Sequence, residues 1–194
     1  MAKGTEGAAG KRASKTGLIV LAVVLVAVIA GAAVAYHALA PIAMPDAAST
    51  AEGEGEQTEA PDFTMISAGG EELSLGSLRG KPVVLNFWAS TCGPCKSEMP
   101  EFQTAFEEYG SQVQFVMLNV PDFNGETRER ALRLVEQSAY TFPIYFDATA
   151  EAQVQYGVTS IPRTYFISAD GILKAYASGV IDAASLDEGI NMLL

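Results

Sequence analysis

Two cysteines, Cys92 and Cys95, stand where an apolar strand pattern gives way to a helical one, and this chain of 194 residues contains no others. Thiols at this Cys-x-x-Cys spacing can close a small disulfide ring and open it again. The N-terminus of a helix carries unpaired N–H groups and the positive end of the helix dipole, which stabilise a thiolate. The position of the pair therefore predicts a redox-active dithiol at a strand-to-helix junction.

Two other interpretations of the cysteine pair can be weighed from the sequence. A zinc site needs about four ligands, usually from two such pairs or from one pair and two histidines. The chain has one histidine, His37, in a different segment, and we expect no metal. A purely structural disulfide across so short a loop would remove little entropy from the unfolded chain. The sequence favours a working dithiol.

The N-terminal part of the chain has the pattern of a membrane anchor. Residues 1–17 carry a net charge of +3 and precede an uncharged run of 22 residues, Leu18 to Leu39. At about 1.5 Å per residue such a helix crosses a hydrocarbon core of about 30 Å. We expect a transmembrane helix over residues 18–40, residues 1–17 in the cytoplasm and the rest of the chain outside. A cleaved signal peptide is the alternative, because A-x-A patterns end at Ala35 and Ala40.

Composition divides the remaining chain into a linker and one domain. Residues 41–61 hold five acidic residues and no basic one, without apolar periodicity, which predicts a disordered acidic linker. Residues 62–194 are long enough for one domain with a sizeable core. This domain has 17 acidic and 8 basic residues, a net charge of −9, which argues against a nucleic acid partner.

Strand and helix patterns alternate along the domain. The run from Pro82 to Trp88 is apolar and β-branched, as is typical of a strand covered on both faces. A hairpin begins the domain, and a second hairpin and a helix end it. This order predicts an α/β fold of three layers, a central mixed sheet flanked by helices. Strands are expected at 62–66, 72–75, 82–88, 112–120, 144–146, 163–168 and 172–178, and helices at 94–109, 126–139, 149–156 and 185–194.

The order of elements and two motifs resemble the thioredoxin superfamily. These motifs are Trp-x-x-x-Cys-Gly-Pro-Cys, beginning at Trp88, and Ser-Ile-Pro-Arg-Thr, beginning at Ser160. The segment Leu75–Pro82 and the stretch Glu98–Pro100 are more closely similar to the membrane-tethered TlpA/ResA branch of extracytoplasmic thiol–disulfide oxidoreductases. The resemblance covers about residues 61–194 and implies a thioredoxin-like fold.

The resemblance assigns roles to the cysteines and their spacer. Cys92 is expected to attack a substrate disulfide as a thiolate, and Cys95 to resolve the mixed disulfide. Gly93 and Pro94 form the spacer found in thioredoxins themselves, which favours a reductant, and they are expected to lie on the substrate-binding surface.

Further site residues also follow from the resemblance. Pro162 is expected to be the cis-proline that faces the disulfide, so that Ile161 offers backbone hydrogen bonds to an extended substrate. Trp88 is expected to pack beneath the disulfide. Thr91 departs from the family pattern, which has tryptophan directly before the first cysteine.

The proton partner of the cysteines is expected to be Glu98. Thioredoxins carry a buried acid on the strand beneath the dithiol, where this chain has Asn86, whereas the TlpA/ResA branch carries a glutamate at the position of Glu98. A partly buried Glu98 would have a raised pKa and could exchange protons with Cys95. A solvated carboxylate in the first turns of the helix is the alternative.

These features together predict a membrane-anchored reductase of protein disulfides outside the cytoplasm, without a bound cofactor. The resemblance implies as substrates the haem-site cysteines of apocytochrome c during cytochrome c maturation, or another protein disulfide. It also implies re-reduction by a membrane electron donor of the CcdA/DsbD kind. A disulfide-forming oxidant and a non-enzymatic chaperone or adaptor stay open as alternatives. A peroxiredoxin is disfavoured, because no Pro-x-x-x-Thr-x-x-Cys pattern precedes the thiol.

Overall fold

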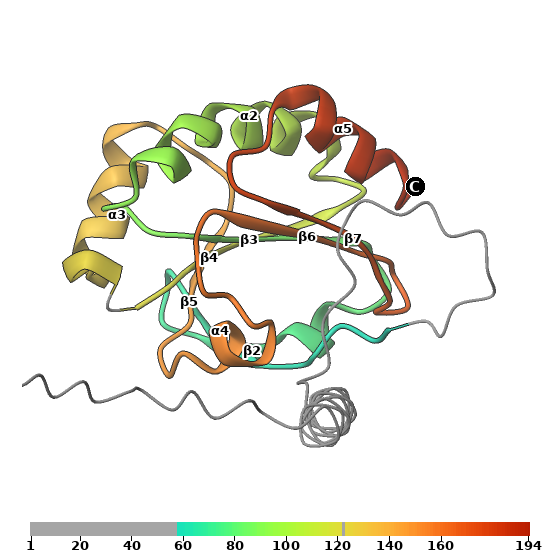
Figure 1. Ribbon diagram of the computed structural model, residues 1–194, viewed down its shortest axis with the longest axis horizontal. Coiled ribbons are helices and arrows are strands. Elements are labelled where there is room, and N and C mark those ends of the chain that lie inside the picture. The colour runs from blue at the N-terminus through green and yellow to red at the C-terminus, as the bar shows by residue number, and fades with distance from the viewer. Residues whose placement is uncertain (1–57, 122) are drawn as a thin grey trace, which may run out of the picture. The chain divides into compact units, whose positions relative to one another are not determined.

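The computed structural model describes residues 58–121 and 123–194, which form a seven-stranded mixed sheet with helices on both faces (Figure 1). The strand order is β2-β1-β5-β4-β3-β6-β7. Within these two ranges, no helix is both long enough and apolar enough to cross a membrane. The expected cytoplasmic segment (1–17) and membrane span (18–40) lie outside the described residues, as does most of the expected linker.

The elements follow the α/β order that the sequence predicts. The strands are β1 (Thr64–Ser67), β2 (Glu72–Ser74), β3 (Val83–Trp88), β4 (Gln114–Asn119), β5 (Ile144–Phe146), β6 (Arg163–Ile167) and β7 (Leu173–Ser178). The helices are α2 (Gly93–Tyr109), α3 (Arg128–Gln137), α4 (Glu151–Gln155) and α5 (Ala183–Asn191), with short 3-10 turns η1 (Leu75–Leu78) and η2 (Phe123–Gly125).

Strand β3 lies at the centre of the fold and leads to the cysteines. All six of its residues are buried, as the apolar run predicts. It pairs in parallel with β4 and antiparallel with β6, so both of its edges are satisfied. Trp88 ends the strand, and α2 begins at Gly93. A fully buried strand, paired on both edges, therefore leads directly to the cysteine pair.

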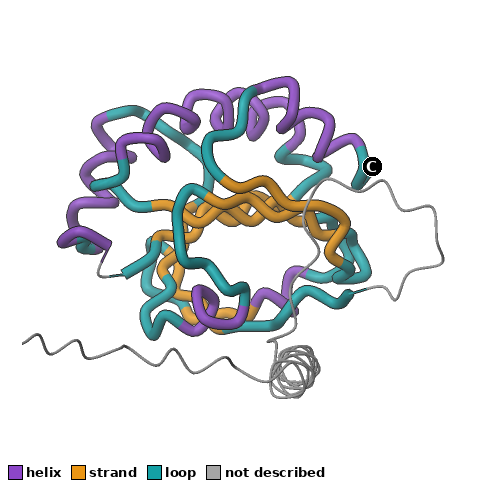
Figure 2. Tube along the Cα trace, in the orientation of Figure 1, coloured by secondary structure: helices purple, strands orange, loops and turns teal. Residues whose placement is uncertain are grey.

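The two faces of the sheet are covered differently. Helices α2, α3 and α5 lie along one face, and α4 lies on the other (Figures 1 and 2). On the α4 side, the rings of Phe63, Phe87, Tyr156 and Tyr165 pack with centroids 4.9–5.8 Å apart. The hydroxyl of Tyr156 donates a 2.9 Å hydrogen bond to the carbonyl oxygen of Pro61, which satisfies the buried polar end of that ring.

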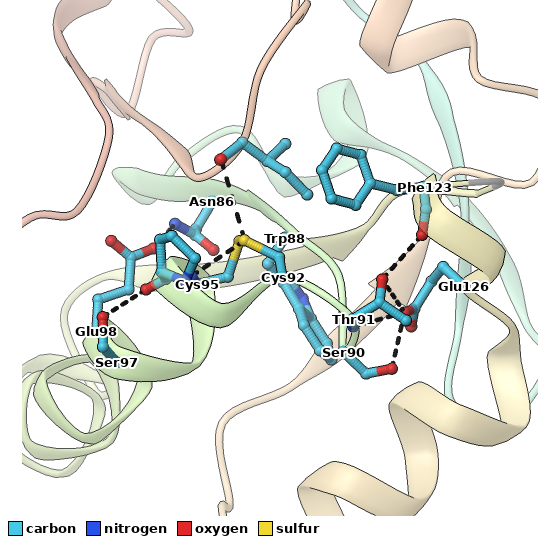
Figure 3. The surroundings of a disulfide bond; sticks show 12 residues. Asn86, Trp88, Ser90, Thr91, Cys92, Cys95, Ser97, Glu98, Phe123 and Glu126 are labelled. Carbon is cyan, nitrogen blue, oxygen red and sulfur yellow. Dashed lines mark hydrogen bonds between the residues drawn. A yellow bond between two sulfur atoms is a disulfide. The ribbon is translucent and has the colours of Figure 1, made fainter.

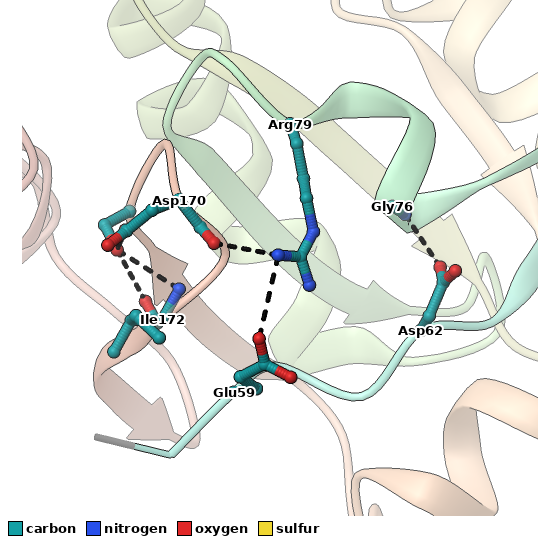
Figure 4. A network of polar contacts seen from close by, with 7 residues as sticks. Glu59, Asp62, Gly76, Arg79, Asp170 and Ile172 are labelled. Atoms are coloured by element: carbon teal, nitrogen blue, oxygen red, sulfur yellow. Dashed lines mark hydrogen bonds and ion pairs between the residues drawn. The ribbon is translucent and has the colours of Figure 1, made fainter.

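Residues 58–61, which we expected in the linker, are ordered against the domain (Figure 4). Glu59 forms a β-bridge with Ile172. Arg79 Nη1 lies 3.8 Å from Glu59 Oε1 and donates a 3.0 Å hydrogen bond to the carbonyl oxygen of Asp170. These contacts come from segments distant in sequence, which is why composition alone places the boundary a few residues late.

Helix starts also differ slightly from the expected positions, and capping explains the difference. Thr127 is the N-cap of α3 and accepts a hydrogen bond from the N–H of Arg130, so the helix begins two residues later than expected. Asp182 caps α5 by accepting from the N–H of Ser185, so this helix begins two residues earlier. In both cases a side-chain oxygen satisfies a free N–H of the first turn.

Gly189 allows α5 to approach the sheet closely. A Cβ at this position would lie 2.2 Å from ring atoms of Phe166, which is itself buried. Gly189→Ala should therefore destabilise the domain by about 1–3 kcal/mol through overpacking, although the same change stabilises an unhindered helix by about 1 kcal/mol. Urea unfolding measures the difference, with the exposed Asn191→Ala as the control. An unchanged or raised stability for Gly189→Ala would contradict this packing.

Candidate active site

The two cysteines form a disulfide at the N-terminus of α2, with Cα atoms 5.3 Å apart (Figure 3). Cys92 is the N-cap residue, and its Sγ accepts a 3.1 Å hydrogen bond from the N–H of Cys95. The exposed fraction is 4% for Cys92 and 0% for Cys95. An incoming sulfur can therefore reach Cys92 first, while Cys95 is shielded inside the helix. This difference in exposure favours attack at Cys92 and resolution by Cys95, and these two roles stay a prediction.

The loop before β6 meets the disulfide from the other side. The Ile161–Pro162 peptide bond is cis, as the sequence predicts. The carbonyl oxygen of Ile161 lies 4.0 Å from Cys92 Sγ, although the two residues are 69 positions apart. The carbonyl oxygen of Pro162 accepts a 3.0 Å hydrogen bond from Gly179. The backbone of Ile161 thus borders the reactive sulfur, and its contact with a substrate stays a prediction.

Glu98 is buried rather than solvated, with 1% of its surface exposed. One carboxylate oxygen accepts a 2.9 Å hydrogen bond from Asn86 Nδ2, and the other accepts a 3.0 Å bond from the N–H of Ile181. Burial raises the pKa of Glu98 to about 7, because desolvation outweighs the lowering effect of these two hydrogen bonds. Glu98 can therefore gain or lose a proton at neutral pH.

Asn86 connects Glu98 to the sheet. Its Nδ2 also donates to Thr164 Oγ1 at 3.1 Å, on the neighbouring strand β6. Its Oδ1 is buried and has no hydrogen-bond partner within the described part of the chain. Figure 3 shows the amide nitrogen on the side of Glu98 and the oxygen on the side of the disulfide. A single amide within an apolar strand is the sequence signal that marks this position.

The other expected site residues lie around the disulfide. Trp88 is fully buried at the end of β3, and Figure 3 shows its ring beside Cys92. Gly93 and Pro94 are exposed, and nothing lies within 4 Å of where a Cβ on Gly93 would stand. The spacer is therefore open to an incoming polypeptide, while the tryptophan supports the disulfide from within.

Thr91, which departs from the family pattern, makes polar contacts instead of presenting a ring. Its hydroxyl donates a 2.8 Å hydrogen bond to the carbonyl oxygen of Phe123. Its backbone N–H donates to the carboxylate of Glu126 at 3.1 Å. No sequence pattern points to Glu126 as a site residue, because Thr91 and Glu126 are 35 positions apart and meet only in the folded chain. Among the described residues, no cluster of His, Cys, Asp and Glu could hold a metal.

Comparison with known proteins supports what this geometry suggests. Residues 57–176 match the model of the AhpC/TSA family. The thioredoxin-like protein YneN of Bacillus subtilis is 32% identical over 140 residues, which are 72% of this chain and 79% of that protein. The thiol–disulfide oxidoreductase ResA of Geobacillus thermodenitrificans is 32% identical over 135 residues, 69% of this chain and 75% of that protein.

A solved structure of a thiol:disulfide interchange protein has the same fold as this chain. The thioredoxin-family thiol:disulfide interchange protein of Chlorobium tepidum superposes with a TM-score of 0.63 at 26% identity, covering 73% of this chain and 99% of its own. The thioredoxin-like fold predicted from the sequence is thereby confirmed. The chain belongs to the AhpC/TSA family, and its Cys92–Cys95 disulfide makes it a thiol–disulfide oxidoreductase of the ResA type.

Proposed function

We propose that the protein reduces disulfides of other proteins outside the cytoplasm, held at the membrane by residues 18–40. The observation that carries the proposal is the buried Glu98 on the same helix as the two cysteines, with a pKa of about 7. Disulfide reduction delivers two electrons and two protons, and a group that titrates near neutrality suits the proton transfer. The Gly-Pro spacer, shared with thioredoxins, supports the reducing direction.

The reaction begins with the reduced enzyme, with Cys92 as a thiolate and Cys95 as a thiol. Cys92 attacks one sulfur of a substrate disulfide, which breaks that bond and releases the other substrate sulfur as a thiolate that takes up a proton. The substrate segment lies along the backbone of Ile161, and the exposed Gly93 and Pro94 leave room for it. The first step ends with a mixed disulfide on Cys92.

In the second step, Cys95 gives its proton to Glu98 and attacks Cys92. The Cys92–Cys95 disulfide forms, and the second substrate sulfur leaves and is protonated. The substrate gains two electrons and two protons. The enzyme supplies both electrons and the Cys95 proton, and solvent supplies the second proton, because Cys92 begins the cycle already ionised. The oxidised enzyme then needs two electrons from outside, because the proposed cycle uses no bound cofactor. A membrane electron donor of the CcdA/DsbD kind would supply them and restore the dithiol. The haem-site cysteines of apocytochrome c are our proposed substrates.

Trapping in cells tests the substrate class directly. Cys95→Ala should accumulate mixed disulfides on Cys92, because the resolving thiol is missing. Purification under non-reducing conditions and mass spectrometry should identify the captured proteins, and apocytochrome c among them would support the proposed substrate. The double variant Cys92→Ala/Cys95→Ala is the control and should capture none. If the single variant also captures none, the proposal of a protein substrate fails.

The role of Glu98 predicts a pH-dependent rate. Wild-type reduction of insulin disulfides should rise with pH through about 7, as Glu98 ionises and becomes able to accept the Cys95 proton. Glu98→Gln should lose this rise and slow the reaction by about 100-fold, near the low end for general acid–base catalysis. The exposed Glu108→Gln on α2 is the matched control. Equal pH profiles for wild type and Glu98→Gln would rule out the role.

The raised pKa also predicts how stability depends on pH. The folded state holds the Glu98 proton up to about pH 7 and the unfolded state only up to about 4.5, so unfolding free energy falls between these values. The full difference is about 3 kcal/mol. The unfolding free energy of the oxidised protein can be measured in urea at pH 4.5 and pH 8. Between these two pH values, wild type should lose most of these roughly 3 kcal/mol relative to Glu98→Gln, which has no proton to release. An identical pH dependence in both proteins would contradict the burial of an ionisable Glu98.

A further inference from the structure

A second buried carboxylate lies on the opposite side of the redox segment from Glu98. Glu126, just before the N-cap of α3, is 6% exposed. Its Oε2 accepts from Ser90 Oγ at 2.7 Å, from the N–H of Thr91 at 3.1 Å and from Thr91 Oγ1 at 3.3 Å (Figure 3). Its Oε1 accepts from Asn119 Nδ2 at 3.1 Å. The reaction described above assigns no part to this group.

The partners of Glu126 suit a negatively charged carboxylate. Ser90, the N–H of Thr91 and Asn119 each donate a hydrogen bond to it, while the single hydroxyl hydrogen of Thr91 is shared with the nearer carbonyl oxygen of Phe123. A carboxylate only accepts. Hydrogen bonds of this kind to an ionised acceptor are the strong ones, and they replace the water that burial removes. Within residues 58–121 and 123–194, one ion pair forms, between Arg79 and Glu59, and Glu126 is not part of it. Arg128, which lines the same pocket as Glu126, donates instead to the carbonyl oxygens of Ser67 and Ala68. The negative charge is therefore held in place but not neutralised by an ion pair there.

The contacts of Glu126 converge on the residues that precede the attacking cysteine. Ser90 and Thr91 connect the end of β3 to the N-cap Cys92. Asn119, at the end of β4, donates to Glu126 and also to the carbonyl oxygen of Trp88, at 3.4 Å. One carboxylate thus links the ends of two central strands to the short segment that sets the position of Cys92.

We propose that Glu126 is a positioning residue that anchors Ser90 and Thr91 and keeps a negative charge close to Cys92. Its carboxylate binds the N–H of the residue directly before Cys92. A negative charge bound to the residue next to Cys92 disfavours the Cys92 thiolate and so opposes the helix dipole. Because the thiolate belongs to the reduced enzyme, the charge favours the disulfide form and makes the dithiol a better electron donor. This inference rests on the proposed function and explains the polar residue at position 91.

The redox equilibrium with glutathione separates charge from structure. Glu126→Gln removes the charge with little change of shape, and it should shift the equilibrium about fivefold toward the dithiol, because the Cys92 thiolate then lacks a nearby like charge. Trp88, the only tryptophan in the chain and adjacent to the disulfide, offers a fluorescence readout. Glu129→Gln, an exposed acid three residues further along, removes the same charge away from the site and should shift the equilibrium less than twofold.

Glu126→Asp tests the anchoring, because it keeps the charge but shortens the reach. It should leave the equilibrium within about twofold of wild type while lowering kcat/KM for insulin reduction by about tenfold, as expected for a misplaced nucleophile. Thermal unfolding verifies that each variant is folded, and this second variant decides the question if Glu126→Gln does not fold. An unchanged equilibrium in Glu126→Gln, or an unchanged kcat/KM in Glu126→Asp, overturns the proposal. Both tests compare a variant with the wild-type protein, so their outcome does not depend on the value of the wild-type reduction potential. That potential tests the proposed function separately.

Discussion

The hydrogen bonds to the buried Glu98 carboxylate connect the elements that surround the disulfide. They join α2, which carries the cysteines, to Asn86 on the central strand and to Ile181 in the loop before α5. Asn86 extends the connection to Thr164 on β6, the strand that follows the cis-proline. A buried carboxyl group needs hydrogen-bond donors to stay charged, and otherwise it takes up a proton. Glu98 has two donors, yet its pKa is raised to about 7, so both protonation states are accessible near neutral pH. The contacts that join these elements therefore also surround the group to which we assign proton transfer.

The redox pair lies between two buried carboxylates with different surroundings. Glu98 has two donors and a raised pKa, which suits a group that exchanges protons. Glu126 accepts hydrogen bonds from Ser90, from the N–H of Thr91 and from Asn119 on β4, which suits a fixed charge. Two residues of one type can serve two purposes because the protein sets the environment of each separately. They lie on opposite sides of one disulfide, so we assign proton transfer to Glu98 and a fixed nearby charge to Glu126.

Local sequence patterns predict much of this fold and part of the site. The apolar run of β3, the two hairpins and the strand-to-helix junction at Cys92 depend on neighbours in the chain, and all are present. Long-range contacts are the part that sequence patterns miss. Ile181 donates to Glu98 across 83 positions, and Glu126 binds Thr91 across 35. No periodicity or motif in the sequence marks either pair. Their residues meet only because β3 and β4 pair in parallel and because the chain returns to α2 before α5. The membrane anchor and the cytochrome substrate stay predictions.

Cys92 and Cys95 should supply electrons to a substrate rather than remove them. The reduction potential of the Cys92–Cys95 disulfide tests this most directly. Equilibration of the full-length protein with glutathione or dithiothreitol buffers at pH 7 would give this value. We predict a potential well below about −200 mV, toward the roughly −270 mV of thioredoxin. A potential well above about −200 mV, toward the roughly −120 mV of a strong disulfide-forming oxidant, would contradict it.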